Sequence, residues 1–319
     1  MGPWRGEVGF ETLYWLPFLE FLKVKYQIPA DRLIPVSRGG ASVWYGTPTG
    51  LELFALRTPQ QVRVKNRLAF QENRMLKQMD PEDPWDLAVL DDAAQKMKLG
   101  RYDVIHPSAM YRLYQEFWEA RRGLDWFRER SQYVKIPAPP LPDSLTLPEH
   151  FLAVRFYSRS TFVGNDLTVP FVSEVLKQLS YKLPVIVLDT GLFVDDHFDF
   201  PVPKDLPNVI PLHTLMPIRP ETNLAVMSAV IARSRGFVGT YGGVAQLAMR
   251  LGVGSISFYD KWHGTAWAHK HLSEVLSAAQ GTSWVVERLM DLPIIQDVCP
   301  RMTIEPATKK SSSAAKVTA

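Results

Sequence analysis

The chain of 319 residues contains a single cysteine, Cys299, so it can form neither an internal disulfide bond nor a cluster of thiolate metal ligands. It lacks any apolar stretch near the roughly 18 residues of a membrane-spanning helix. Its first residues lack the basic and apolar regions of a secretory signal peptide. An excess of one charge is also missing, because 36 basic and 33 acidic residues leave a net charge of +3. These absences predict a cytoplasmic protein that does not require nucleic acid as a partner.

Several chemical signatures are missing as well. The histidines His263, His269 and His271 have a spacing that matches no standard zinc pattern, so we expect no metal site. No Gly-x-Ser-x-Gly sequence occurs, which leaves a serine hydrolase without support. The glycine-rich runs fit neither the dinucleotide fingerprint nor the P-loop, and we expect no cofactor.

The length suits two domains of about 150 residues each. Five prolines occur in the fourteen residues 135–148, and prolines at this density fix φ and remove hydrogen-bond donors. We therefore predict an N-terminal domain over residues 1–134, a stiff linker over 135–148 and a C-terminal domain over 149–306. Residues 307–319 lack large apolar side chains and are predicted to be disordered.

After the linker, short apolar runs alternate with segments of helical periodicity. Runs that we interpret as strands begin at residues 151, 184, 208, 236 and 254, and predicted helices cover 171–179, 223–233 and 244–251. Strands separated by such helices predict a parallel, doubly wound sheet.

The N-terminal half has helical patterns over 10–25, 60–79 and 107–130, and a strand-like run over 32–36. We therefore predict an α/β fold of two Rossmann-like, doubly wound domains that face a cleft.

The run 236–243 carries the strongest functional signal. A predicted strand leads through Thr240, Tyr241, Gly242 and Gly243 directly into a helix. Glycines allow the backbone to approach a ligand closely, and free amides in a first helical turn attract phosphate. These four residues, with Gln246 in the helix that follows, are our candidates for donor binding, although a simple tight turn would explain the glycines too.

A second glycine-rich loop opens the chain and contains Glu7, with Glu11 four residues later. A carboxylate here can act as a general base on an acceptor hydroxyl, and Glu11 could support or replace Glu7. The alternative is that Glu7 only complements the helix dipole.

Two arginines follow the first strand of the second domain. Arg155 ends the predicted strand and Arg159 lies four residues on, among hydroxyl side chains. Arginine grips a diphosphate bidentately, so we predict that Arg155 neutralises the leaving phosphate and that Arg159 assists it. An interdomain salt bridge fits Arg155 equally well.

The remaining candidates are weaker. Glu221 and Asn223 start a predicted helix and could hold the ribose or base of a donor, although helix capping explains them more simply. Arg5, Arg38 and His106 are candidates for acceptor contacts.

Residues 6–22 resemble the start of heptosyltransferase-like glycosyltransferases, where a Gly-acid-Val loop leads into a helix with a Leu-Pro step. Those enzymes have an acidic catalytic residue at the position of Glu7. Residues 237–253 are similar to their donor motif, with the run 240–243 and Gln246 replacing its acid and histidine. The same segment is similar to the donor loop of GDP-fucose-dependent transferases, whose diphosphate-gripping arginine follows a strand as Arg155 does.

The resemblance implies the GT-B arrangement and an inverting, metal-independent glycosyltransferase of polysaccharide biosynthesis. It would move a sugar from a nucleotide-diphosphate sugar to a glycan or lipid-linked acceptor. Peripheral attachment at the inner membrane face through residues 111–130 is an additional hypothesis, and a buried core helix is the alternative. A nucleotide-sugar epimerase and a non-catalytic glycan-binding protein remain rival functions.

Overall fold

The computed structural model describes residues 1–72, 77–192, 194, 197–203, 205–261 and 266–289. The predicted disordered tail over 307–319 therefore lies outside the described residues, as do Cys299 and His263.

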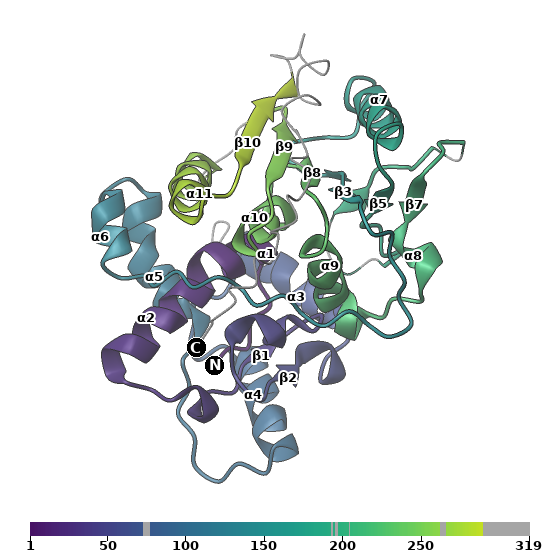
Figure 1. The fold of residues 1–319 in the computed structure, drawn as a ribbon. Helices are drawn as coiled ribbons and strands as arrows, with labels where there is room; N and C mark the ends of the chain where they lie inside the picture. Colours follow the sequence, from purple (N-terminus) through teal and green to yellow (C-terminus); the bar gives the residue numbers. More distant parts are fainter. Residues whose placement is uncertain (73–76, 193, 195–196, 204, 262–265, 290–319) are drawn as a thin grey trace, which may run out of the picture.

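A six-stranded parallel sheet forms the centre of the C-terminal half (Figure 1). Its strands are β3 (Leu152–Arg155), β5 (Val185–Val187), β7 (Val209–Pro211), β8 (Phe237–Thr240), β9 (Ser255–Tyr259) and β10 (Trp284–Arg288). Every neighbouring pair is parallel, in the order β10-β9-β8-β3-β5-β7. The predicted parallel sheet is confirmed.

The order of the strands contains one reversal. The chain first moves outward from β3 to β5 and β7, and then returns to the other side of β3 for β8, β9 and β10. Ligands of open α/β sheets bind at such a switch point, outside the carboxyl ends of the two strands that flank it. Here those strands are β3 and β8, which lead into Tyr157 and Tyr241 respectively.

Helices cover both faces of the sheet. Alternate residues of β3 point to opposite sides, so Leu152 and Val154 pack with helix α7 (Thr168–Ser180), while Ala153 joins the larger core on the other face. That larger core receives α9 (Asn223–Ile231), α10 (Gly243–Arg250) and α11 (Ala266–Gln280). Smaller elements near the carboxyl edge are β4 (Tyr157–Ser158), β6 (Phe198–Asp199), α8 (Leu212–Leu215) and η5 (Pro220–Thr222).

The N-terminal half is mostly helical. One continuous helical segment comprises α1 (Val8–Phe10), the π-helical turn η1 (Glu11–Trp15) and α2 (Leu16–Tyr26). The other elements are η2 (Ala30–Arg32), β1 (Val36–Ser37), η3 (Ala41–Tyr45), β2 (Leu51–Glu52), η4 (Leu53–Ala55), α3 (Pro59–Glu72), α4 (Pro84–Lys96), α5 (Pro107–Trp118) and α6 (Leu124–Arg128). Aromatic residues such as Trp4 and Tyr14 pack in the same core as Leu247 and Leu272 of the sheet half.

A second doubly wound domain is not evident in the described N-terminal residues, whose assigned strands are the parallel pair β1 and β2. Residues 1–4 nevertheless bond to chain segments on both sides. The Val36 amide donates to the Met1 carbonyl at 2.9 Å, and the Trp4 amide donates to the Val36 carbonyl at 2.7 Å. On the opposite side, the Gly2 amide donates to the Ile105 carbonyl at 3.0 Å.

The loop over 38–40 ties the two halves together. The Gly39 carbonyl accepts hydrogen bonds from the Leu224 and Ala225 amides, both at 2.9 Å, and so caps α9. The Glu52 carboxylate accepts from the Gly39 amide at 2.8 Å and from the Gly40 amide at 2.7 Å. Both glycines have positive φ, 66° and 76°, which residues with a side chain rarely adopt.

The secondary structure differs from the sequence prediction in several places. The helical pattern over 107–130 is divided into α5 and α6, because Gly123 precedes the second helix in an extended conformation. Helix α4, helix α11 and strand β10 were not predicted. The predicted linker over 135–148 stays a prediction, and its Ile136 amide donates to the Arg250 carbonyl of α10 at 3.1 Å.

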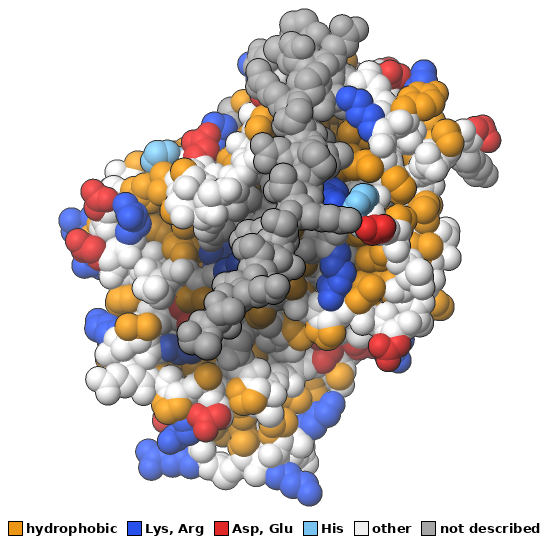
Figure 2. All heavy atoms as spheres, viewed as in Figure 1, with side chains coloured by type: hydrophobic (Ala, Val, Ile, Leu, Met, Phe, Trp, Pro, Cys, Tyr) orange, Lys and Arg blue, Asp and Glu red, His pale blue; other side chains and the backbone are white. Residues whose placement is uncertain are grey.

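None of the helices in the described part of the chain combines the length and the apolar character needed to cross a bilayer. On the face drawn in Figure 2, acidic and basic side chains are both spread over the surface, in keeping with the small net charge.

Candidate functional site

The two glycine-rich loops meet at the switch point. Gly9 of α1 and Gly243 of α10 come so close that a Cβ atom on Gly243 would lie 2.7 Å from the Gly9 nitrogen and 3.1 Å from the Val8 Cβ. The first turns of α1 and α10 are therefore neighbours, and the positive ends of two helix dipoles converge. Glycine is required because the two backbones touch.

We expect Gly243→Ala to lower the free energy of unfolding by about 1–3 kcal/mol, because its methyl group would overlap the backbone of Gly9. Urea unfolding measures the change. Gly100→Ala is the control, since a Cβ atom on Gly100 meets nothing within 4 Å. Equal stability of the two variants would contradict the close approach of α1 and α10.

Tyr157 and Arg159, which follow β3, lie over the first turn of α10. A Cβ atom on Gly242 would collide with the Tyr157 hydroxyl and with Nη1 of Arg159. Thr240, fully buried, fixes this arrangement because its Oγ1 accepts from the Tyr157 amide at 3.0 Å and donates to the Tyr157 carbonyl at 3.1 Å. A guanidinium and the start of a helix thus converge at the carboxyl ends of β3 and β8.

Glu7 lies at the opposite side of this junction, as the residue that precedes α1. Its Oε1 accepts a hydrogen bond from Nζ of Lys77 at 3.0 Å, and its side chain is 43% exposed. The Lys77 ammonium lowers the pKa of Glu7 to about 2, with Arg159 and His197 adding to the effect and desolvation opposing it. Glu7 is therefore a carboxylate at neutral pH, with the Lys77 ammonium beside it and the Arg159 guanidinium acting on it.

Two histidines also belong to the surroundings of Glu7. The ring of His197 packs against that of Tyr157 at a tilt of 51°, with centroids 4.8 Å apart. His269 of α11 places Nδ1 2.6 Å from the Tyr14 hydroxyl. Burial lowers the pKa of His269 to about 4, partly opposed by the negative charge of Glu7, so the ring is neutral at pH 7.

Because the pKa of His269 is lowered, we expect the free energy of unfolding to depend on pH below neutrality. The unfolded chain takes up this proton near pH 6.5 and the folded chain only near pH 4, so stability falls as the pH falls between these values. Over that interval the wild-type free energy of unfolding should fall by roughly 3 kcal/mol more than that of His269→Gln. Urea unfolding at both pH values measures this.

The control is His271→Gln, because His271 is 54% exposed on the same helix and should leave the wild-type dependence on pH unchanged. An unchanged pH dependence in His269→Gln would show that the histidine is not held neutral.

Arg155, which was predicted to bind the diphosphate, forms an ion pair with Asp199. Its Nε donates to Oδ1 of Asp199 at 3.1 Å and its Nη2 to Oδ2 at 3.5 Å, so the ion pair is bidentate. Its guanidinium also lies 5.4 Å from the ring centre of Tyr157. The arginine that reaches the start of α10 is Arg159.

The Glu11 side chain does not join that of Glu7, although the Glu11 amide donates to the Glu7 carbonyl at 3.0 Å. Glu7 has an extended backbone, with ψ of 152°, so its side chain does not follow the helical repeat. Glu11 is fully buried and accepts from Ser37 at 2.7 Å, from Tyr45 at 2.6 Å and from Arg38 at 3.0 Å. Burial raises the pKa of Glu11 despite these donors. Arg38 also donates to the Gly6 carbonyl and thereby fixes the loop that carries Glu7.

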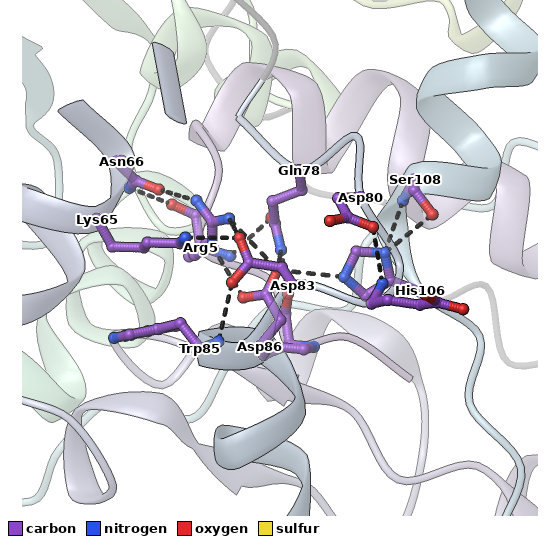
Figure 3. A network of polar contacts seen from close by, with 12 residues as sticks. Arg5, Lys65, Asn66, Gln78, Asp80, Asp83, Trp85, Asp86, His106 and Ser108 are labelled. Carbon is purple, nitrogen blue, oxygen red and sulfur yellow. Dashed lines mark hydrogen bonds and ion pairs between the residues drawn. The ribbon is translucent and has the colours of Figure 1, made fainter. Parts of the chain in front are cut away.

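Arg5 and His106, predicted acceptor contacts, meet at Asp86 inside the N-terminal half (Figure 3). Arg5 is 1% exposed and binds Asp86 through Nε at 2.9 Å and Nη2 at 3.3 Å. Nε2 of His106 lies 3.2 Å from the same carboxylate. Burial would raise the pKa of Asp86, but His106 and Arg5 outweigh burial and hold it below its usual value. These buried residues support the loop that carries Glu7.

The remaining predicted donor residues are largely enclosed. Tyr241 and Gln246 are each 3% exposed, and their side chains hydrogen-bond to each other. Gln246 also lies against Gly9. Asn223 is 3% exposed at the start of α9, below the Gly39 cap, whereas Glu221 is partly exposed in η5.

Three residues of this junction were not identified from the sequence: Lys77, His197 and Tyr157. They come from separate segments and share no motif or spacing. The only available signal was the position of Tyr157 just after a predicted strand.

The fold and the site define an α/β protein with a charged, glycine-lined junction at the switch point of a parallel sheet. Comparison of the chain with models of protein families, with curated proteins and with solved structures finds no match.

Proposed function

We propose that this chain is a glycosyltransferase that uses a nucleotide-diphosphate sugar, with the diphosphate bound at the first turn of α10 and Arg159. The observation that carries the proposal is the convergence of Arg159, the start of α10 and the Glu7 loop at the switch point. Phosphate binds well to helix N-termini and arginine, and ligands of open α/β sheets occupy this position.

The proposed reaction is an inverting displacement. The acceptor hydroxyl attacks the anomeric carbon, the bond from that carbon to the phosphate oxygen breaks, and the nucleoside diphosphate leaves. Glu7 accepts the hydroxyl proton, and Arg159 with the α10 amides stabilises the negative charge on the leaving group. Arg155 would act indirectly in this scheme, by fixing Tyr157 and Asp199 beside the site.

The proposal includes a reduced second Rossmann-like unit in the N-terminal half. Residues 1–4 bond to the segment at Val36 on one side and to Ile105 on the other, and β1 pairs with β2. This support is limited to the order of the segments, in which the first lies between the other two, as the first strand of a doubly wound sheet does. Glu7 would then follow the first strand position, as its catalytic role in the GT-B arrangement requires.

One observation favours a second candidate, a non-catalytic glycan- or nucleotide-binding protein. A general base works best when its pKa lies near the working pH, and the pKa of Glu7 is about 2 while Lys77 is paired with it. The same basic groups, Lys77 and Arg159, would bind an anionic ligand without any chemistry.

Incubation with UDP-, GDP- and ADP-sugars, with and without a panel of glycan acceptors, tests the proposal. We expect release of the nucleoside diphosphate only when an acceptor is present. Conversion of the sugar without an acceptor would indicate the epimerase instead. Stabilisation by a nucleotide without any turnover would favour the binding protein, because a ligand of the folded state raises the unfolding temperature.

A further inference from the structure

A pair of polar side chains lies beside the proposed phosphate site. Asp189 is the second residue after β5, and His213 is the second residue of α8, the helix that follows β7. Nδ1 of His213 lies 3.4 Å from Oδ2 of Asp189 and 3.3 Å from the Asp189 carbonyl. The Gly191 amide donates to Oδ1 of Asp189 at 2.8 Å, so the carboxylate is held in one orientation. Asp189 is 25% exposed and His213 is 43% exposed.

The pair presents hydrogen-bond acceptors. Nδ1 of His213 faces two acceptor oxygens and therefore carries a proton, which leaves Nε2 as the ring nitrogen that can meet a ligand hydroxyl. The Asp189 carboxylate keeps lone pairs beyond the one that Gly191 uses. Phosphate oxygens, which are acceptors, are disfavoured here, whereas hydroxyl groups, which can donate, fit.

The position of the pair relative to the phosphate site follows from the sheet. β5 is the direct neighbour of β3, with Val187 opposite Val154, and the Leu188 amide donates to the Val154 carbonyl at 2.7 Å. β8, which leads into α10, is on the other side of β3. Asp189 is therefore two strand spacings, about 10 Å, from the end of β8 along the carboxyl edge.

Donors and acceptors are thus separated along one edge of the sheet. Arg159 and the first turn of α10 offer donors at the switch point, and Asp189 with His213 offers acceptors one strand beyond β3. A nucleoside diphosphate has the complementary order, with acceptor oxygens on its phosphates, followed by the two hydroxyls of its ribose. Glu221 and Asn223 fit this role less well, because the Gly39 carbonyl covers the start of α9.

We infer that Asp189 and His213 bind the vicinal 2′- and 3′-hydroxyl groups of the donor nucleotide's ribose. This inference rests on the proposed function and specifies the ligand further. The donor must be a ribonucleotide, and its ribose diol binds on the β5–β7 side of the switch point.

The test compares three ligands by calorimetric titration: UDP, GDP or ADP, whichever the wild-type protein binds, its 2′,3′-dideoxy form, and inorganic pyrophosphate. For the wild type we expect loss of the hydroxyls to weaken binding by about tenfold or more. Asp189→Asn should weaken the ribonucleotide similarly and leave the dideoxy form and pyrophosphate unchanged.

The control is Asp205→Asn, because it removes the same charge from an exposed site before β7, at the opposite edge of the sheet. Equal wild-type affinity for the ribonucleotide and its dideoxy form would overturn the inference, and this comparison needs no variant. An equal loss of affinity for all three ligands in Asp189→Asn would also overturn the inference. If the wild type binds neither nucleotides nor pyrophosphate, the proposed function itself fails, and the inference with it.

Discussion

Replacement of Asp86 by alanine is expected to lower the free energy of unfolding by about 3–5 kcal/mol. Asp86 is fully buried and Arg5 is 1% exposed, so the substitution would leave the Arg5 guanidinium in the interior without its bidentate partner. His106 would lose its partner as well. Urea unfolding followed by circular dichroism measures the change.

Two further variants sharpen this test. Asp91→Ala removes an exposed carboxylate from the same helix, α4, and should change stability by no more than about 0.5 kcal/mol. The double variant Arg5→Met with Asp86→Leu removes both charges and should be more stable than Asp86→Ala. A loss below about 1 kcal/mol in Asp86→Ala would show that the buried pair does not hold the Glu7 loop.

Glu7→Gln is expected to reduce kcat by about 10²–10⁴-fold in the proposed transfer reaction, because an amide cannot accept the acceptor's proton. Its effect on folding should be small, since the lost ion pair with Lys77 lies at a side chain that is 43% exposed. The affinity for a nucleoside diphosphate should be kept or increased, because a negative charge disappears from beside the proposed phosphate site. Steady-state kinetics and titration with the nucleotide measure the two effects separately.

Glu82→Gln is the matched control, as it removes an exposed carboxylate from the same half of the chain. Unchanged kcat in Glu7→Gln would exclude Glu7 as the base. Loss of nucleotide binding together with activity would instead assign Glu7 a structural role in the loop.

The sequence predicted the sheet half well. Buried parallel strands are short apolar runs, and those beginning near residues 151, 184, 208, 236 and 254 all became strands of one sheet. β10 was missed because its sequence, Trp-Val-Val-Glu-Arg, ends in charged residues at the edge of the sheet. The N-terminal half was less predictable, since its strand-like segments bond over only one or two residues.

The candidate site was predictable where it depends on backbone and not where it depends on side-chain pairing. Glycines indicate places where two backbone segments come close together, so the loops that contain Glu7 and Gly243 could be recognised. The partner of each charged side chain is decided by packing between distant segments. Arg155 forms an ion pair with Asp199, and Glu7 forms one with Lys77, 70 residues away in the sequence. No local sequence pattern specifies either pair.

Titration of nucleoside diphosphates into the wild type and Arg159→Met tests the central claim most directly. The wild type should bind at least one of UDP, GDP and ADP, and Arg159→Met should bind it at least about tenfold more weakly. Arg235→Met, which removes an exposed arginine at the amino end of β8, should bind like the wild type. Binding that is absent from the wild type, or unchanged in Arg159→Met, would contradict a phosphate site at the switch point.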